Sequence, residues 1–517
     1  MSIASYPHLK RRRAESNYSR QQLSLLSPVR KLPAEILEQV FAAVCVYGLE
    51  LRRDSVKTVT ISLSQVCSSW RRLILIAPRL WSGPGLYVDL LVPLGVAEEL
   101  ISIYLERSSQ APLKLFITAS TQPPETYRSV PPLAPRALVR FLMLLDTSSR
   151  WKEAHIQLPW SANRSIPAFR NIGDINSFHS LEELRIFWDT DMNLVEEEND
   201  GDFFELFSDA PNLRHLTIPS ALPLIGLPWS QLTSLGPIRD GNTQNILHVL
   251  ERCQSVHSFV LKPKASPGVS EKELVGLHEI GARSLSFLRD RSNSIKLFEL
   301  MSHLTAKNLV SLIIQGHITG YFNQGSWDSP LKDFLSRSGC SLRSLTLDGN
   351  CTGIADALLD LLPLVPTLTY LKVVWTDLED HPLFERLFER LTIPSETTSV
   401  PILPSLEIID LDHHISFAQV TGYILKILNM AESRSRSLSH FDSEGHMINS
   451  RLTSLSVGIR FVDRVNRAVY LGSVEKMRAS KEGGMKVQIN IRPVIYILGR
   501  RTHAGFFCHA VCEYPWY

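Results

Sequence analysis

Four residues near the end of the chain have the types and approximate spacing of metal ligands. His503, Cys508, His509 and Cys512 offer two imidazoles and two thiols, which are donors that zinc prefers in proteins. A structural zinc site usually consists of two well-spaced pairs on ordered turns, and this set matches that spacing only loosely. We therefore expect no metal site here.

A second polar group lies at the end of an apolar run. His413 and His414 follow Asp410 and Asp412, and an ordinary loop position accounts for both histidines. The sequence contains no G-x-x-x-x-G-K-[ST], no G-x-G-x-x-G after a strand, no G-x-S-x-G and no H-E-x-x-H. Because no constellation supports catalysis, we predict a protein that is not an enzyme and needs no cofactor.

The charge of the chain is unevenly distributed although its sum is small. The 517 residues are 44% hydrophobic and 21% charged, with a formal net charge of +2. Residues 1–31 carry +6 and residues 434–517 carry +7, which leaves −11 for the middle of the chain. A nucleic-acid-binding protein needs lysine and arginine on its binding surface, so the acidic middle argues against nucleic acid as a partner.

Length alone predicts about three units unless the chain is a repeat array.

Cysteine usage and the absence of targeting segments predict a cytoplasmic or nuclear protein. The seven cysteines mostly lie inside apolar patterns, which suits buried thiols in a reducing compartment. The N-terminus has no apolar signal segment, and no apolar run is long enough to span a membrane. The basic run Lys10–Arg13 suits a nuclear-import patch, an electrostatic contact for nucleic acid, or a flexible tail with neither role.

Two short helical patterns lie between residues 32 and 81. Pro33 and Glu35 suit the first turn of the first helix. Its apolar stripe consists of Ile36, Leu37, Val40, Phe41 and Val44. The second stripe consists of Leu63, Val66, Cys67, Trp70 and Ile74. About fifty residues bury little core alone, so this segment predicts a helical docking module that needs a partner.

The ordered pattern of this segment resembles an F-box. It comprises Leu32-Pro33, Glu35-Ile36-Leu37, Val40-Phe41, Val66-Cys67, Trp70-Arg71, Pro78 and Leu80-Trp81. In form it is most similar to the F-box proteins that are abundant in mushroom-forming fungi. The segment Cys45–Ile61 departs from the family because it is a long, polar link between the two helices.

The resemblance implies an adaptor of an SCF ubiquitin ligase. An F-box docks a SKP-family linker protein and, through it, a cullin, while the remainder of the chain recruits a protein substrate. By matching motif position, the expected linker contacts are Leu32, Pro33, Ile36, Leu37, Val40, Val66, Trp70 and Trp81. A helix has only one apolar stripe, so some members must pack inward, and we expect Phe41, Cys67 and Ile74 to do so.

After residue 81 an imperfect L-x-x-L-x-L motif recurs, with helical patterns between the copies. The last two apolar positions alternate as on a strand with one buried face. The eight clear copies begin at Leu181, Leu213, Val256, Leu309, Leu342, Leu368, Leu406 and Leu452. Weaker copies begin at Leu113, Ile156, Leu232 and Leu285. This alternation predicts an irregular leucine-rich-repeat α/β solenoid, with a parallel sheet on one side and helices on the other. An ordinary α/β domain with a parallel sheet is the alternative.

These patterns divide the chain into four regions. We predict a disordered basic leader at 1–30, a short all-α F-box at 31–82, the solenoid with a terminal capping unit at 83–492, and an unassigned tail at 493–517. The insertion at residues 189–205 is strongly acidic, and either a solvated loop or a surface for a basic ligand fits it. A second function remains open, in which the chain is a repeat scaffold without a ligase role and the F-box-like segment is only an N-terminal cap. An apolar helix face turned to solvent favours docking, and one buried on the first repeats favours a cap.

Overall fold

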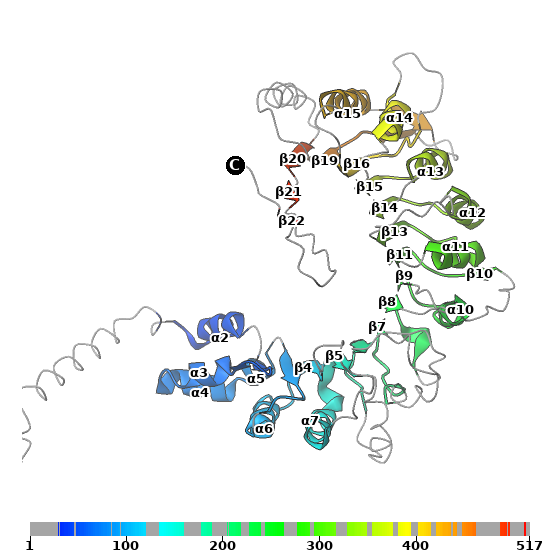
Figure 1. Cartoon of the computed structure of the whole chain (residues 1–517). Coiled ribbons are helices and arrows are strands. Elements are labelled where there is room, and N and C mark those ends of the chain that lie inside the picture. Colours follow the sequence, from blue (N-terminus) through cyan, green and yellow to red (C-terminus); the bar gives the residue numbers. More distant parts are fainter. Residues whose placement is uncertain are drawn as a thin grey trace, which may run out of the picture. The chain divides into compact units, whose positions relative to one another are not determined.

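The structure is a computed structural model of the whole chain, and two compact units are distinguished, Met1–Leu213 and Arg214–Tyr517. It describes residues 29, 32–45, 48–83, 85–93, 95–119, 134–159, 177–188, 204, 206–218, 227–238, 243–262, 277–289, 294–316, 328–348, 354–375, 381–393, 402–414, 420–435, 438–441, 447–461, 486–493, 495–496 and 511–512. The leader at 1–28, the acidic segment at 189–203 and the predicted helix of the capping unit, before residue 486, lie outside these residues. The protein has an α/β fold with largely parallel sheets (Figure 1).

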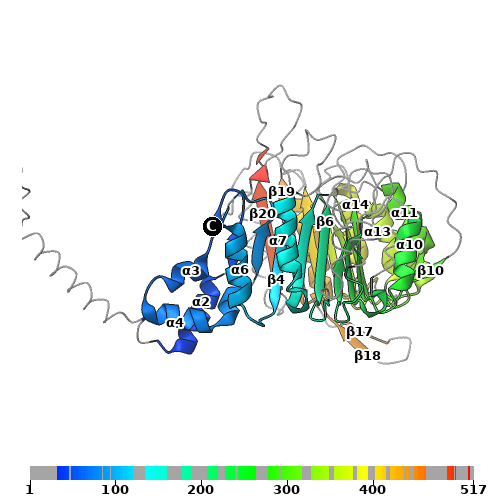
Figure 2. The same ribbon diagram turned by 90° about the horizontal axis from the view of Figure 1, so that it is seen from below.

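The first unit combines four N-terminal helices with a sheet. The helices are α2 (Ala34–Val44), α3 (Val59–Ser64), α4 (Ser68–Ile76) and α5 (Pro78–Ser82). The sheet has the order β2-β1-β3-β4-β5-β6, and all neighbours except β2 and β1 are parallel. Its strands are β1 (Leu49–Leu51), β2 (Val56–Lys57), β3 (Leu86–Asp89), β4 (Leu113–Thr118), β5 (Trp151–Leu158) and β6 (Glu183–Trp188). The connecting helices α6 (Ala97–Arg107) and α7 (Pro135–Leu145) lie side by side (Figures 1 and 2).

The link between the two predicted helices is a strand pair that joins the sheet. Leu49 and Leu51 on β1 are fully buried, and β1 runs parallel to β3. Glu50 lies between them and is nearly buried, and its carboxylate bonds the Lys57 ammonium at 2.9 Å. Gly48 allows the chain to pass closely, because a Cβ there would lie 2.7 Å from the Trp81 carbonyl oxygen. The expectation of an all-α module at 31–82 was wrong, since β1 and β2 lie within it and each residue of β1 pairs with one 37 positions further along the chain.

The second predicted helical stripe is interrupted. Residues 63–74 were expected to continue as one helix, but α3 ends at Ser64 and α4 starts at Ser68. Cys67 occupies the N-cap of α4, where its Sγ accepts a hydrogen bond from the Trp70 amide at 3.5 Å. Because a capping thiol satisfies a free helix amide, Cys67 has a local structural role rather than a purely apolar one.

The second unit is a longer sheet with the order β7-β8-β9-β11-β13-β14-β15-β16-β19-β20. Its strands are β7 (His215–Thr217), β8 (Ser234–Ile238), β9 (Ser258–Leu261), β11 (Ser284–Arg289), β13 (Ser311–Gly316), β14 (Ser344–Asp348), β15 (Tyr370–Trp375), β16 (Ile408–His414), β19 (Ser454–Phe461) and β20 (Lys486–Pro493). Its helices α10 (Thr243–Arg252), α11 (Ser294–His303), α12 (Asp328–Ser338), α13 (Ile354–Leu361), α14 (His381–Leu391) and α15 (Val420–Ser435) lie along one side of these strands (Figure 1). The described pairings between these strands are parallel.

Each clear copy of the repeated motif coincides with a strand and with the turn that leads into that strand. In one example, Leu342, Leu345 and Leu347 are all buried, while Ser344 between them is half-buried. Equivalent leucines stand in register on neighbouring strands, as with Leu312, Leu345 and Leu371. The motif therefore marks the strands that form the core of both units. We expected His413 and His414 as loop histidines at the end of a repeat strand, and they are the last two residues of strand β16 itself.

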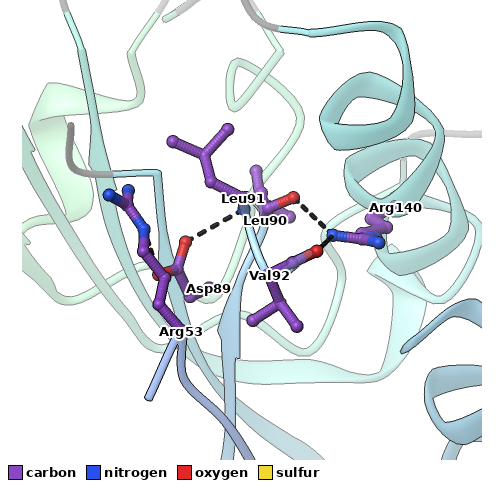
Figure 3. A network of polar contacts seen from close by, with 6 residues as sticks. All are labelled: Arg53, Asp89, Leu90, Leu91, Val92 and Arg140. Carbon is purple, nitrogen blue, oxygen red and sulfur yellow. Dashed lines mark hydrogen bonds and ion pairs between the residues drawn. The ribbon is translucent and has the colours of Figure 1, made fainter. Parts of the chain in front are cut away.

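Arginines secure the connections at strand and helix ends. Arg140 on α7 is buried, and its Nη1 donates to the carbonyl oxygens of Leu90 (2.8 Å) and Val92 (2.7 Å) after β3 (Figure 3). Asp89 holds the same turn by accepting from the Leu91 amide (2.9 Å) and from Arg53 (3.1 Å). The bonds from Arg140 satisfy carbonyl groups of a turn that lies outside the helices and strands.

A buried arginine also bonds carbonyl oxygens in the second unit. The buried Arg434 on α15 donates to the carbonyl oxygens of Leu391 (2.6 Å), Leu403 (2.9 Å) and Ile402 (2.5 Å). Burial lowers the pKa of Arg434 to about 10. Its hydrogen bonds pair the end of helix α14 and the following turn with the next helix.

Within the described residues, no helix is long and apolar enough to cross a membrane.

Candidate functional site

The candidate site is an apolar surface on the N-terminal helices, which we call the docking face. It consists of the exposed apolar residues Leu32, Ile36, Val40, Val44, Val66 and Ile76. Helix α2 follows Pro33, and the Leu37 amide donates to the Pro33 carbonyl at 3.0 Å, closing the first turn. Its apolar residues point to two sides, which creates both a packing surface and an exposed surface.

The inward side of α2 holds the helices together. Leu37 and Phe41 are buried, and the Phe41 ring meets the Trp70 ring of α4 edge to face, with centroids 4.6 Å apart. Such an aromatic pair contributes about 0.5–1.5 kcal/mol beyond the area it buries. Ile74 on α4 is fully buried as well. Of the three residues expected to pack inward, Phe41 and Ile74 do so, and Cys67 is half-buried at its helix cap.

The outward side of α2 is unusually apolar for a surface. Ile36, Val40 and Val44 are 41%, 44% and 51% exposed, and they recur at helical spacing on one face. Single exposed apolar residues are common on proteins, but a contiguous row points to an interaction surface. Val66 before α4 and Ile76 at its end are 60% and 71% exposed.

A hollow of about 420 Å³ lies between the start of α2 and helix α4. Leu32, Leu37, Trp70, Leu73 and Ile76 provide much of its apolar lining. The polar residues Ser68, Ser69 and Arg72 also line the hollow. A concave apolar site beside an exposed apolar row is suited to receiving side chains of another protein.

Trp81 occupies a different place from the other predicted contacts. Its side chain is buried, and its Nε1 donates to the Ile74 carbonyl oxygen at 2.8 Å. Its ring packs edge to face on Tyr104 of α6, with centroids 5.1 Å apart. Burial raises the pKa of Tyr104 to about 12. Trp81 therefore fastens the helices to the sheet, and a partner has no direct access to it.

The structure divides the eight predicted contacts into two groups. Leu32, Pro33, Ile36, Val40 and Val66 are exposed, and Trp70 is half-buried at the edge of the hollow. Leu37 and Trp81 are buried and pack beneath the exposed residues. The pattern matching missed Ile76, although the uniformly apolar run Leu73–Ile76 was a sign that α4 exposes apolar residues on more than one side.

The described residues contain no group of histidine, cysteine, aspartate and glutamate side chains that could hold a metal ion. Cys512 lies on the short strand β22 (Val511–Cys512), and the other three candidate ligands near it fall outside the described residues. Cys253 is buried, and burial raises the pKa of its thiol to about 12. Burial likewise raises the pKa of Cys45, so both thiols are held in the unreactive protonated form.

Comparison of the chain with protein-family models and with curated proteins finds no match.

Proposed function

We propose that this chain is a substrate-recruiting adaptor of an SCF ubiquitin ligase. Its docking face binds a SKP-family linker protein and through it a cullin, and its sheets belong to a leucine-rich-repeat solenoid that binds the target protein. The chain itself carries out no bond chemistry in this proposal. It raises the effective concentration of the target beside the ubiquitin-conjugating enzyme.

The observation that carries the proposal is the two-sided packing of helix α2. If the helices were only a cap, their apolar residues would be satisfied by the unit on which they pack. Instead Leu37 and Phe41 provide that packing, while Ile36, Val40 and Val44 stay exposed within the described part of the unit. Among the described residues this second apolar side takes little part in packing, which supports a partner-binding role over the scaffold alternative.

Hydrogen–deuterium exchange of the full chain, with and without purified SKP-family linker, tests the proposal. We expect the linker to slow exchange in 34–44 and 66–76, where the exposed apolar residues lie, and to leave β4 and β5 unchanged. Unchanged exchange throughout residues 32–82 at saturating linker would leave the scaffold function as the better account.

A further inference from the structure

A continuous row of residues marks the amino-terminal edge of the second unit's sheet. We call it the edge row, and its members are Arg214, Thr233, His257, Arg283, Val310, Arg343, Thr369, Glu407 and Thr453. Each amide in this row donates to the carbonyl of the preceding member. The Arg283 amide donates to the His257 carbonyl at 2.9 Å, and the Arg343 amide donates to the Val310 carbonyl at 2.8 Å. The edge row therefore has the regular spacing of neighbouring strands, about 4.8 Å per step.

The first six positions of the edge row are basic or uncharged. Arg214, His257, Arg283 and Arg343 are all exposed, and the first carboxylate of the row is Glu407, two strands beyond Arg343. The middle of the chain as a whole carries a net negative charge, so this basic row differs from the sequence around it. A local basic edge on an acidic background attracts an anionic partner selectively.

Hydroxyl groups accompany these cations on the next position of each strand. The residues after the edge row on β8, β9, β11, β13 and β14 are Ser234, Ser258, Ser284, Ser311 and Ser344, which stand in register. All five are half-buried. Serine hydroxyls donate hydrogen bonds to carboxylates, so this column adds neutral donors to the cationic edge.

The cations at the centre of the row are available for a partner. Within the part of the chain that the structure describes, the side chains of Arg283 and Arg343 form no hydrogen bond or ion pair. Two carboxylates in the neighbouring connections already have partners: Glu251 bonds His278 at 2.6 Å, and Glu279 bonds Lys307 at 2.8 Å. The basic edge is thus not neutralised by these acids.

We infer that the edge row from Arg214 to Arg343 binds an acidic, extended polypeptide segment rich in aspartate and glutamate. The six positions span about 24 Å, so the cations are spread along a line instead of converging on one point. A single phosphate needs several donors at one place, whereas an extended chain of about seven residues covers this length. This inference rests on the proposed function, because the acidic segment would belong to the target protein that the adaptor recruits.

Binding of labelled peptides to the full chain tests this inference without any linker protein. The probes are fluorescein-labelled octaglutamate, octaglutamine as the uncharged control, and octauridylate RNA as a polyanion of another class. The test variant is Arg283→Glu with Arg343→Glu. The matched control is Arg252→Glu with Arg390→Glu, which makes the same charge change at exposed positions on helices α10 and α14.

We expect saturable binding of octaglutamate that weakens with salt, and no binding of octaglutamine. The test variant should lower the affinity at least ~10-fold and the control variant less than ~2-fold, with unchanged circular dichroism for both. Absence of octaglutamate binding, equal losses in the two variants, or tighter binding of the RNA would each overturn the inference. A failure of the chain to bind the linker would contradict the proposed function alone, because these peptide measurements do not involve it.

Discussion

The exposed side of helix α2 gives the most quantitative prediction, because its residues contribute little to folding and, in the proposed function, much to docking. Ile36 and Val40 are 41% and 44% exposed in the free chain. With residue areas of about 185 and 160 Å², these fractions leave about 75 and 70 Å² for a partner to cover, or ~3.6 kcal/mol at about 25 cal/mol per Å². Alanine keeps part of that area, so Ile36→Ala with Val40→Ala should cost about 2 kcal/mol of linker binding, roughly 30-fold in Kd.

Isothermal titration calorimetry of the full chain with purified SKP-family linker measures this loss. The matched control is Ile103→Ala with Val139→Ala on helices α6 and α7, which removes the same two side-chain types at 39% and 50% exposure. We expect the control to bind like the unsubstituted chain. Both variants should unfold within ~1 kcal/mol of that chain, because exposed positions affect folding little.

Two results would refute this reasoning. Unchanged binding by the Ile36→Ala, Val40→Ala chain would show that the exposed side of α2 is not the contact. An equal loss in both variants would show that the linker responds to surface apolarity in general. Leu37 is unsuitable for this test, because it is buried and a charge there would disrupt the helix packing along with the surface.

Three further predictions concern single residues. Iodoacetamide should modify Cys67, which lines the hollow, faster than the buried Cys253. Saturating linker should slow the modification of Cys67. Equal rates with and without linker would count against contact at the hollow. Gly85→Ala should destabilise the first unit by ~1–3 kcal/mol in chemical denaturation, because the new Cβ would lie 2.6 Å from Cε2 of Phe116. The loss should shrink when Phe116→Ala is added, and an unchanged loss would contradict that cause. Arg434→Met should lower the stability of the second unit by about 3 kcal/mol, since it leaves buried carbonyl oxygens without donors, and a neutral effect on its unfolding would contradict that role.

The repeated apolar motif made the strands predictable from the sequence. Three apolar positions at fixed spacing report one buried strand face, and this signal is local, so each copy could be recognised alone. Local helical patterns likewise predicted helices at Glu98–Arg107, Asn245–Arg252 and Leu383–Leu391, which lie within α6, α10 and α14. Helix α11 (Ser294–His303) was not predicted, although its sequence carries apolar residues at helical spacing.

Features that depend on distant partners were not predictable. β1 is only three residues long, and its burial results from pairing with β3 far along the chain. The division of the α2 stripe into inward and outward residues depends on where Trp70 and Trp81 lie in space. Trp81 matched a contact position of the F-box pattern, yet it is buried because α6 offers Tyr104 as a packing partner. A motif reports which residue types occur, but exposure decides which of them a partner can touch.

Assembly of the full chain with purified SKP-family linker and a cullin tests the central claim most directly. We predict that size-exclusion chromatography gives one complex containing all three proteins, and that the cullin joins only when the linker is present. Elution of the chain apart from the linker, under conditions in which linker and cullin form their own complex, would contradict the adaptor function and favour an independent scaffold.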